Sequence, residues 1–477
     1  MKVLFLNPPS FKDFDGGAGS RYQAQREVRS FWYPTWLAYP AGMLQDSLLL
    51  DAPAANLGVK QTLDIARNFD LTVFYTSTPS LKNDIATAER LKREKPTMKV
   101  TFVGPHPTVL PRETLQASGV IDFVVRKEFD YAIPDYANGR PLSEIPSVTW
   151  RREDGEVVTN PLAPELKDLD SLPFAADVYK RDLKLEHYEI PWMLNPYVSV
   201  YTGRGCGSQC TFCLWPQTFS GNRYRVRTPE NVAEEVGKII KYWPKMRQYF
   251  FDDDTFTEQQ PRAREISRKL ARFGKEWGCN TKVVVSYETL KEMRDAGCRV
   301  LVAGFESGSN QILKNIQKGA TVQQAYEFAR NCRKLGILVH GTFIVGLPGE
   351  TRETLEESMR FACELDIDTI QVSLASPYPG TKFYEHVIKN GYMTAESLVS
   401  EHGYQTCNVS YPDVTSREIF DAMDLFYRRF YFRGRCIKRI VGRMLKDPDE
   451  RNRKLREGVE FVKFMLRRRA GASAANC

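Results

Sequence analysis

Short apolar runs alternate with longer helical segments in the first part of the chain, and this alternation is the strongest constraint on its fold. The helical segments between the runs are Asn56–Asn68 and Leu81–Lys95. Alternation on this length scale predicts a parallel sheet with helices on both faces. The runs of strand length are Val3–Leu6, Leu48–Asp51, Leu71–Tyr75, Val100–Val103 and Phe123–Val125.

A second alternating block extends from Tyr197 to Gly391. Six βα units in this block match the length of about 30 residues that each unit needs, and they predict a partial (β/α)6 barrel. Its active site is then expected at the carboxyl ends of the strands. The predicted strands are Val198–Tyr201, Gln248–Phe251, Lys282–Val285, Val300–Ala303, Val339–Val345 and Thr369–Leu374. The predicted helices are Pro229–Lys241, Gln260–Trp277, Tyr287–Ala296, Val322–Leu335 and Arg352–Leu365.

The two blocks divide the 477 residues into several parts, because a chain of this length exceeds one ordinary domain. Residues 1–145 are predicted to form a Rossmann-type domain and residues 196–391 the barrel. Residues 146–195 are proline-rich and are predicted to be a linker with a hairpin at 153–156. Residues 392–477 are predicted to be a helical, basic C-terminal region.

Three cysteines, Cys206, Cys210 and Cys213, follow the first barrel strand at spacings of four and three residues. One disulfide would leave a thiol over, and a tetrahedral zinc site needs a fourth ligand that the neighbourhood lacks. A four-iron cluster fits better, because three thiolates leave one iron open to a further ligand. Three unrelated cysteines in a loop are the alternative. The other seven cysteines are scattered singly and predict no second cluster.

The pattern Cys-x3-Cys-x2-Cys, with Phe212 before its last cysteine, resembles the signature of radical S-adenosylmethionine (SAM) enzymes. The resemblance implies that Cys206, Cys210 and Cys213 hold a [4Fe–4S] cluster and that SAM binds the open iron through its amino and carboxylate groups. Phe212 is then expected near the adenine. In this family the reduced cluster cleaves SAM to a 5′-deoxyadenosyl radical.

Residues at the ends of the predicted barrel strands are further candidates for SAM binding. The adjacent carboxylates Asp253 and Asp254 repel each other, and the positive charges of SAM would stabilise them; a helix N-cap at Asp254 is compatible with this role. Glu306 corresponds by resemblance to a glutamate that helps to hold SAM. The remaining expected contacts are Ser286, Ser307, Phe343, Gly346 and Pro348.

Residues 1–145 resemble the flavodoxin-like cobalamin-binding domain that precedes many radical SAM domains. The resemblance rests on the Gly104–Thr108 turn and the segments that follow it. Ligands of such sheets bind beyond the strand ends, so cobalamin is expected at Thr76, Ser77, Gly104, Pro105 and His106. The Asp-x-His-x-x-Gly motif of many cobalamin proteins is absent. His106 is therefore expected to have a structural role, and the lower cobalt ligand is left open. A domain that binds nothing is the alternative.

The net charge of +8 comes from the tail, where residues 427–469 hold sixteen Lys or Arg and five Asp or Glu. Basic helices with apolar faces are typical of contact with an anionic membrane surface. A solvated cap over the barrel is the alternative, and no nucleic-acid motif is found. No run of eighteen apolar residues or signal peptide is found, so a cytoplasmic protein is expected, with peripheral membrane association.

The opening segment, with Gly16–Tyr22 and Phe31–Trp36, resembles a hopanoid-biosynthesis radical SAM subfamily that forms the cyclitol ether of bacteriohopanetetrol. The resemblance implies a hopanoid substrate whose amino-sugar head group undergoes ring contraction, and an electron donor such as a flavodoxin or ferredoxin. One alternative is a cobalamin-dependent C-methyltransferase that acts on a lipid or another unactivated carbon. A non-catalytic lipid-surface protein with a structural cluster is the other.

Overall fold

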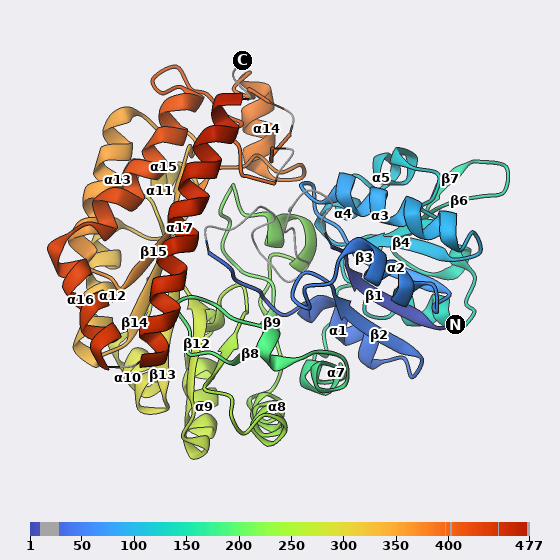
Figure 1. The fold of residues 1–477 in the computed structure, drawn as a ribbon, viewed down its shortest axis with the longest axis horizontal. Helices are drawn as coiled ribbons and strands as arrows, with labels where there is room; N and C mark the ends of the chain where they lie inside the picture. The colour runs from blue at the N-terminus through green and yellow to red at the C-terminus, as the bar shows by residue number, and fades with distance from the viewer. Residues whose placement is uncertain (10–27, 396, 401–402, 447, 475–477) are drawn as a thin grey trace.

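Two α/β units lie side by side in the structure, a computed structural model (Figure 1). It describes residues 1–9, 28–395, 397–400, 403–446 and 448–474. The glycine-rich segment Gly16–Tyr22 lies outside these residues. The first unit contains the N-terminus, and the second is a half-open barrel with the C-terminal helices packed along it.

The first unit is built on a seven-stranded sheet, sheet A, in the order β2-β1-β3-β4-β5-β6-β7. The first five of these strands in space are parallel, and β6 and β7 are an antiparallel hairpin added at the edge. The predicted hairpin therefore exists and is part of sheet A. The strands are β1 (Val3–Asn7), β2 (Ser47–Asp51), β3 (Leu71–Tyr75), β4 (Lys99–Val103), β5 (Phe123–Val125), β6 (Val148–Arg151) and β7 (Val157–Thr159).

Helices cover both faces of sheet A, as predicted. Successive residues of β1 alternate between two apolar clusters, Val3 and Phe5 in one, Leu4 and Leu6 in the other, because side chains of a strand point to opposite faces. The helices of this unit are α1 (Thr35–Gly42), α2 (Val59–Ala66), α3 (Leu81–Glu94), α4 (Pro105–Val109), α5 (Pro111–Ala117), α6 (Ala132–Ala137) and α7 (Ala175–Asp182).

The second unit contains the six-stranded sheet B, in the order β15-β14-β13-β12-β11-β8, with every pair parallel. This is the predicted partial barrel, open between β8 and β15. The strands are β8 (Tyr197–Val200), β11 (Gln248–Phe251), β12 (Glu276–Thr281), β13 (Cys298–Glu306), β14 (Leu338–Val345) and β15 (Thr369–Leu374). Two short strands, β9 (Gly203–Arg204) and β10 (Arg225–Val226), pair beside the cysteine segment.

Three helices of the barrel, α8, α12 and α13, begin after a threonine that caps their first turn. Thr228, Thr321 and Thr351 each accept a hydrogen bond from the backbone N–H three residues on, which satisfies a free donor of the first turn. The helices are α8 (Pro229–Tyr242), α9 (Gln260–Leu270), α10 (Tyr287–Asp295), α11 (Asn310–Asn315), α12 (Val322–Leu335) and α13 (Arg352–Leu365).

The predicted third barrel strand, Lys282–Val285, is wrong. The strand is β12, six residues earlier at its start, and the predicted helix Gln260–Trp277 ends at Leu270 to make room for it. Trp277 and Cys279 of β12 are buried between neighbouring strands. The valine-rich segment has a higher strand propensity, but pairing and burial decide which residues form a strand.

The C-terminal region is helical, as predicted. It contains α15 (Ser416–Tyr431), α16 (Gly434–Lys446) and α17 (Pro448–Ala474), and α14 (Lys382–Lys389) precedes it. Helix α17 runs along the open side of the barrel (Figure 1). Within the described ranges, no helix has the length and apolar character needed to cross a membrane.

Candidate active site

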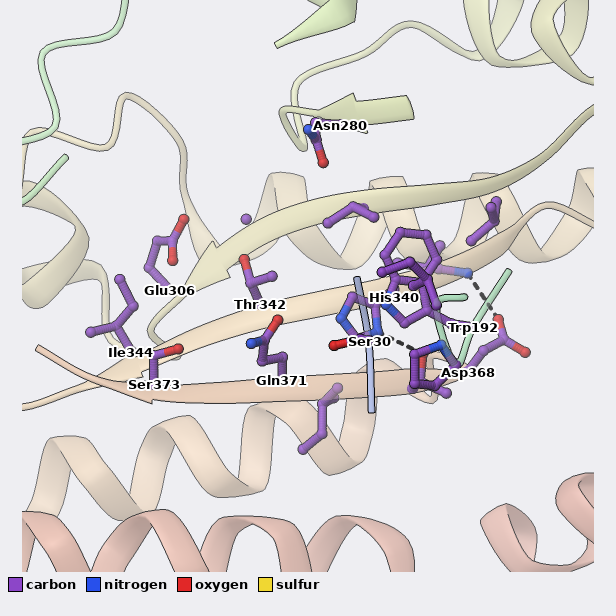
Figure 2. A pocket seen from close by; sticks show the side chains of 18 of the residues that line it. Ser30, Trp192, Asn280, Glu306, His340, Thr342, Ile344, Asp368, Gln371 and Ser373 are labelled. Atoms are coloured by element: carbon purple, nitrogen blue, oxygen red, sulfur yellow. Dashed lines mark hydrogen bonds between the residues drawn. The ribbon is translucent and has the colours of Figure 1, made fainter. Parts of the chain in front are cut away.

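A cavity of about 1270 Å³ runs along the inner face of sheet B to the carboxyl ends of its strands. Figure 2 shows Thr342 of β14 and Gln371 and Ser373 of β15 among its lining residues, with Glu306 at the end of β13. Active sites of α/β barrels lie at this end of the sheet. The cavity is therefore the candidate active site.

The three cysteines predicted to bind the cluster all line this cavity. Their loop is organised by Gln217, whose side-chain NH2 group donates to the carbonyls of Cys210 (3.2 Å), Thr211 (3.0 Å) and Cys213 (2.8 Å). One side-chain amide thus binds three backbone carbonyls of the loop and holds the loop in one conformation. The sequence motif contains no signal for Gln217, because it lies four residues beyond the last cysteine.

The arrangement of the thiols fits a cluster rather than a single metal ion. Within the described part of the chain, no three His, Cys, Asp or Glu side chains are grouped closely enough for one ion. A four-iron cluster does not require this, because each thiolate binds a different iron. Cys206, Cys210 and Cys213 are not in disulfide bonds. The N–H of Ser208 donates to Cys206 Sγ (3.5 Å), a contact of the kind that tunes cluster sulfur ligands.

The consecutive aspartates that follow β11 point to different sides of the sheet. Asp252 and Asp254 line the cavity, whereas Asp253 does not. Asp253 is fully buried and accepts hydrogen bonds from Thr202 N and Oγ1 (both 2.6 Å) and from Tyr224 OH. Burial raises its pKa. The predicted SAM contact at Asp253 is therefore misplaced, because adjacent residues of an extended chain point in opposite directions.

Glu306 lines the cavity and forms a buried ion pair with Lys318 (2.6 Å). Burial acts to lower the pKa of Lys318, but the Glu306 carboxylate and the Cys210 thiol outweigh it, so the pKa is raised and the amine stays charged. Gly304 leaves the space for this pair, since a Cβ there would lie 2.7 Å from Lys318 Nζ. The site thus carries a charged amine close to the cysteines that sequence reasoning missed.

Phe212 lines the cavity as well, whereas the predicted SAM contacts Ser286, Ser307, Phe343, Gly346 and Pro348 do not. Ser286 caps helix α10 instead of ending a strand, because β12 ends at Thr281. Ser307 is hydrogen-bonded to Ser358 (3.0 Å), and Phe343 stacks on Phe305 on the helix-covered face of sheet B.

Gly346 and Pro348 lie in the turn after β14, where their backbone groups are already used. Gly346 N donates to Glu350, and the Pro348 carbonyl accepts from Asn315 Nδ2 (2.9 Å). This turn has a positive φ of 90° at Gly346, a conformation that glycine adopts without strain. Both residues shape the strand end and do not reach the cavity.

Side chains that point to the opposite face of sheet B line the cavity in place of the predicted ones. Thr342 and Ile344 face it from β14, and Asn280 faces it from β12, where its side chain donates to Asp252 Oδ1 (2.9 Å). His340 also lines it, stacked on Trp192 at 4.9 Å. Burial lowers the pKa of His340 to about 3, so the ring is neutral at pH 7.

The cobalamin residues predicted from sequence gather at the carboxyl ends of β3 and β4. Gly104 has a φ of 107°, and a Cβ at this position would lie 2.8 Å from the Thr76 carbonyl. Only glycine therefore fits this close turn. Ser77 is hydrogen-bonded to Ser80 Oγ, and Pro105 begins helix α4. The turn and its uncharged hydroxyl groups fit a bound neutral, polar ligand.

His106 makes contacts that agree with the structural role expected for it. Its Nδ1 is hydrogen-bonded to Thr78 Oγ1 (3.0 Å), and the residue is buried. Burial lowers its pKa to about 4, so the ring stays neutral. The structural interpretation of His106 matches these contacts.

A buried ion cluster joins the first unit to the cysteine loop. Arg204, two residues before Cys206, makes two hydrogen bonds to Asp130 (2.7 and 2.8 Å) and one to Glu128 (3.2 Å). Its guanidinium also lies 4.4 Å from the ring centre of Trp36. Cation–π and bidentate contacts of this kind fix both position and orientation.

Helix α17 closes the open side of the barrel and lines the cavity. Arg453 and Lys454 donate to the carbonyls of Met193 (2.8 Å) and Pro191 (3.0 Å), just before the edge strand β8. Phe461 packs against Tyr427 of α15, which covers the other edge strand, β15. These contacts favour the predicted cap over the barrel.

The fold and the site define a two-domain radical SAM protein. The radical SAM superfamily profile matches residues 200–362, and the B12 binding domain profile matches residues 25–137. The chain belongs to the radical SAM superfamily and contains a B12 binding domain. Its cofactors are therefore a [4Fe–4S] cluster, SAM and cobalamin, and it needs a reductant and a substrate.

Particular relatives span nearly the whole chain. The uncharacterized methyltransferase PH0819 of Pyrococcus horikoshii is 31% identical over 452 residues, which cover 92% of this chain and 94% of that protein. The anaerobic magnesium-protoporphyrin IX monomethyl ester cyclase of Rubrivivax gelatinosus is 26% identical over 90% of this chain and 77% of that protein.

A solved structure with the same fold is the radical SAM methyltransferase TsrM from Kitasatospora setae, with cobalamin and a [4Fe–4S] cluster bound. The TM-score is 0.67 at 17% identity, and the match covers 90% of this chain and 88% of that chain. At this identity the likeness extends to the fold alone.

Proposed function

We propose that the protein is a cobalamin-dependent radical SAM methyltransferase that acts on an unactivated carbon. The carrying observation is that the cavity at the carboxyl ends of sheet B contains a loop that also packs against the carboxyl end of sheet A. The cavity contains the cysteine loop, and its lining residue Trp215 stacks on Tyr75, at the carboxyl end of β3 in sheet A. A substrate in this cavity would lie between the cluster and the cobalamin domain.

The relatives support methyl transfer. PH0819 is named as a methyltransferase and matches over 92% of this chain, and TsrM is a methyltransferase that holds both cobalamin and the cluster. The cyclase relative indicates that the same architecture also serves other reactions. Sequence similarity therefore supports the radical SAM class of the protein more firmly than it supports methyl transfer as the reaction.

When bound, SAM and the reduced cluster would supply a 5′-deoxyadenosyl radical for hydrogen abstraction, and methylcobalamin would supply the methyl group. The thiolates of Cys206, Cys210 and Cys213 would hold the cluster. Glu306 would accept hydrogen bonds from SAM while Lys318 compensates its charge. The barrel walls and helix α17 would shield a bound substrate from part of the solvent, which protects a reactive substrate from side reactions.

The polar side chains deeper in the cavity would orient the substrate. Thr342, Gln371 and Ser373 offer uncharged hydrogen-bonding groups on adjacent strands. His340 stays neutral near pH 7 because burial lowers its pKa. It would therefore serve as a hydrogen-bonding partner rather than as a proton donor of ordinary pKa.

Ring contraction of a hopanoid head group remains a prediction that the relatives support less well than methyl transfer. The glycine-rich part of the subfamily resemblance lies outside the described residues. Two further predictions belong to the proposal: a hopanoid or other lipid-linked substrate, and a flavodoxin- or ferredoxin-like electron donor. The two reactions differ in products, which makes them separable.

The test is anaerobic reconstitution with iron and sulfide, then incubation with dithionite, SAM, methylcobalamin and a lipid extract containing glucosaminyl hopanoids. Mass spectrometry follows 5′-deoxyadenosine, S-adenosylhomocysteine and new lipids. Methyl transfer predicts both nucleoside products and a lipid heavier by one methylene. Deoxyadenosine with a new lipid of unchanged carbon count would instead support ring contraction. No deoxyadenosine from protein with an intact cluster would support the binding-protein alternative and reject both reactions.

A further inference from the structure

Helix α17 carries an apolar stripe on its outer side that has no counterpart in an ordinary surface helix. The stripe consists of Leu455, Val459, Val462 and Leu466, which are 57%, 54%, 56% and 66% exposed. Their spacing of four, three and four residues places them on one face of the helix. Water therefore contacts a continuous row of branched aliphatic side chains.

This stripe is separate from the side of α17 that packs on the barrel. Glu457 and Phe464 are both 8% exposed, and Phe464 packs against Tyr404 at 5.5 Å. The helix is thus apolar on two faces, and the barrel covers only one of them. Packing on the barrel does not account for the second face.

The preceding helix α16 has a stripe of the same kind. Ile437, Val441 and Leu445 follow one another at intervals of four residues and are 45%, 45% and 81% exposed. Helices α16 and α17 pack against each other. Phe432, at the junction of α15 and α16, is 77% exposed and adds an aromatic ring beside them.

The charge of α16 indicates what these stripes contact. Its thirteen residues include five Lys or Arg and no Asp or Glu. Arg439 is paired with Asp366 (2.6 Å), whereas Arg435 and Lys438 are exposed beside the apolar stripe. Exposed aliphatic side chains flanked by cations are typical of helices that lie in the interface of an anionic membrane.

We infer that the outer faces of α16 and α17 dock on an anionic lipid membrane. The exposed aliphatic stripes enter the interface, and the flanking cations contact the lipid phosphates. A large exposed apolar patch with this charge pattern needs such a partner, because water alone leaves it unsatisfied.

The docking face is continuous with the active-site cavity. Leu455, Val459, Val462 and Phe432 line the cavity as well as being exposed. Together with the proposed function, on which this step rests, the continuity assigns the substrate to amphipathic membrane lipids. These lipids would enter along α17 with their apolar part leading. The docking itself does not depend on the reaction.

Vesicle co-sedimentation of the full chain tests the inference without any cofactor. One vesicle set contains phosphatidylcholine alone, and the other has part of it replaced by phosphatidylglycerol. The wild type is expected to sediment with the anionic set at least tenfold more strongly. The variant Leu455→Glu/Val459→Glu is expected to lose this binding. In the control Leu162→Glu, a single glutamate replaces a residue that is 47% exposed in the connector, far along the chain, and binding is expected to persist.

A second variant, Arg435→Gln/Lys438→Gln, isolates the electrostatic part and is expected to weaken binding to anionic vesicles while leaving the melting temperature unchanged. Failure of the folded wild type to bind anionic vesicles would overturn the inference, as would equal binding to both vesicle sets. Dimerisation that the glutamate pair abolishes, without vesicle binding, would identify the face as a contact between copies of this chain. Vesicle binding without lipid methylation would reject the proposed function and leave the docking intact.

Discussion

The carboxyl ends of both sheets lie beside the cysteine segment, but they are built from different chemistry. Sheet A ends in hydroxyl groups, a close glycine turn and the neutral His106, which Thr78 holds in place. Sheet B ends in thiols, carboxylates and the Glu306–Lys318 ion pair around an open cavity. The same architecture therefore presents one uncharged edge suited to hold a ligand and one charged edge suited to bind a metal cluster.

Replacing one cluster ligand should have the largest effect, because the cluster is the feature that distinguishes the end of sheet B from that of sheet A. We expect Cys210→Ala to lose the iron–sulfur absorbance and all SAM cleavage, with the melting temperature changed by only a few degrees. Absorption spectra and deoxyadenosine formation after reconstitution measure this. The control Cys363→Ala alters a cysteine outside the cavity and should keep both properties. Normal cluster content in Cys210→Ala would contradict the ligand assignment.

Glu306→Gln tests the charge balance at the end of sheet B. Removing one partner of a buried ion pair typically costs about 3–5 kcal/mol, because the other charge is left uncompensated. We expect this variant to unfold at lower denaturant concentration and to bind SAM more weakly. The double variant Glu306→Gln/Lys318→Met should recover most of the stability without recovering SAM affinity. Recovery of both would mean that Glu306 acts only as the partner of Lys318.

Both units also bury carboxyl groups whose pKa is raised, and Asp84 in the first unit and Glu350 in the second allow a matched comparison. Burial raises the pKa of Glu350 to about 8 and that of Asp84 to about 7. Between the unfolded value near 4 and these values, the folded state keeps a proton that the unfolded chain releases. Stability is therefore expected to fall as the pH rises through this window.

Glu350→Gln should remove part of that pH dependence. The amide resembles the protonated carboxyl, so the variant is expected to be more stable than the wild type above pH ~8 by on the order of 1–3 kcal/mol, with no gain near pH ~4. Urea unfolding at several pH values measures this, and Asp84→Asn gives the matched test in the first unit. An unchanged slope in both variants would contradict the raised pKa values.

The smallest effect is expected at His106, for which we predict a structural role and no bond to cobalt. His106→Asn should lower stability by about 1 kcal/mol through its hydrogen bond to Thr78 and leave cobalamin affinity nearly unchanged. The absorption and electron paramagnetic resonance spectra of bound cob(II)alamin should match those of the wild type. Thr78→Val is the control that removes only the bonding partner. Loss of nitrogen coupling in His106→Asn alone would establish coordination by this ring.

The fold class could be predicted because the apolar runs of both sheets are flanked by helical patterns. Lys282–Val285 shows where this reasoning fails, since a valine-rich run lies outside the sheet while Trp277 and Cys279 form a strand. Intrinsic strand propensity alone does not decide which of these segments forms a strand. The neighbouring strands β11 and β13 select the residues that pair.

The candidate site was predicted where a local motif carries it and missed where spatial neighbours do. The cysteines and Glu306 line the cavity, but the predictions of Asp253 and Phe343 fall on the wrong side of their strands. A strand end can be located from sequence, whereas a one-residue change of parity reverses the direction of every side chain. Lys318 reaches the site through the turn after α11, which no local pattern indicates.

The ion cluster of Arg204 has a consequence for how the two cofactors come to stand at a set distance. Arg204 belongs to the strand that leads into the cysteine loop, and Asp130 belongs to the first unit. The polypeptide itself therefore ties the cobalamin domain to the segment that leads into the cysteine loop, and this contact helps to set the distance between the two cofactor sites.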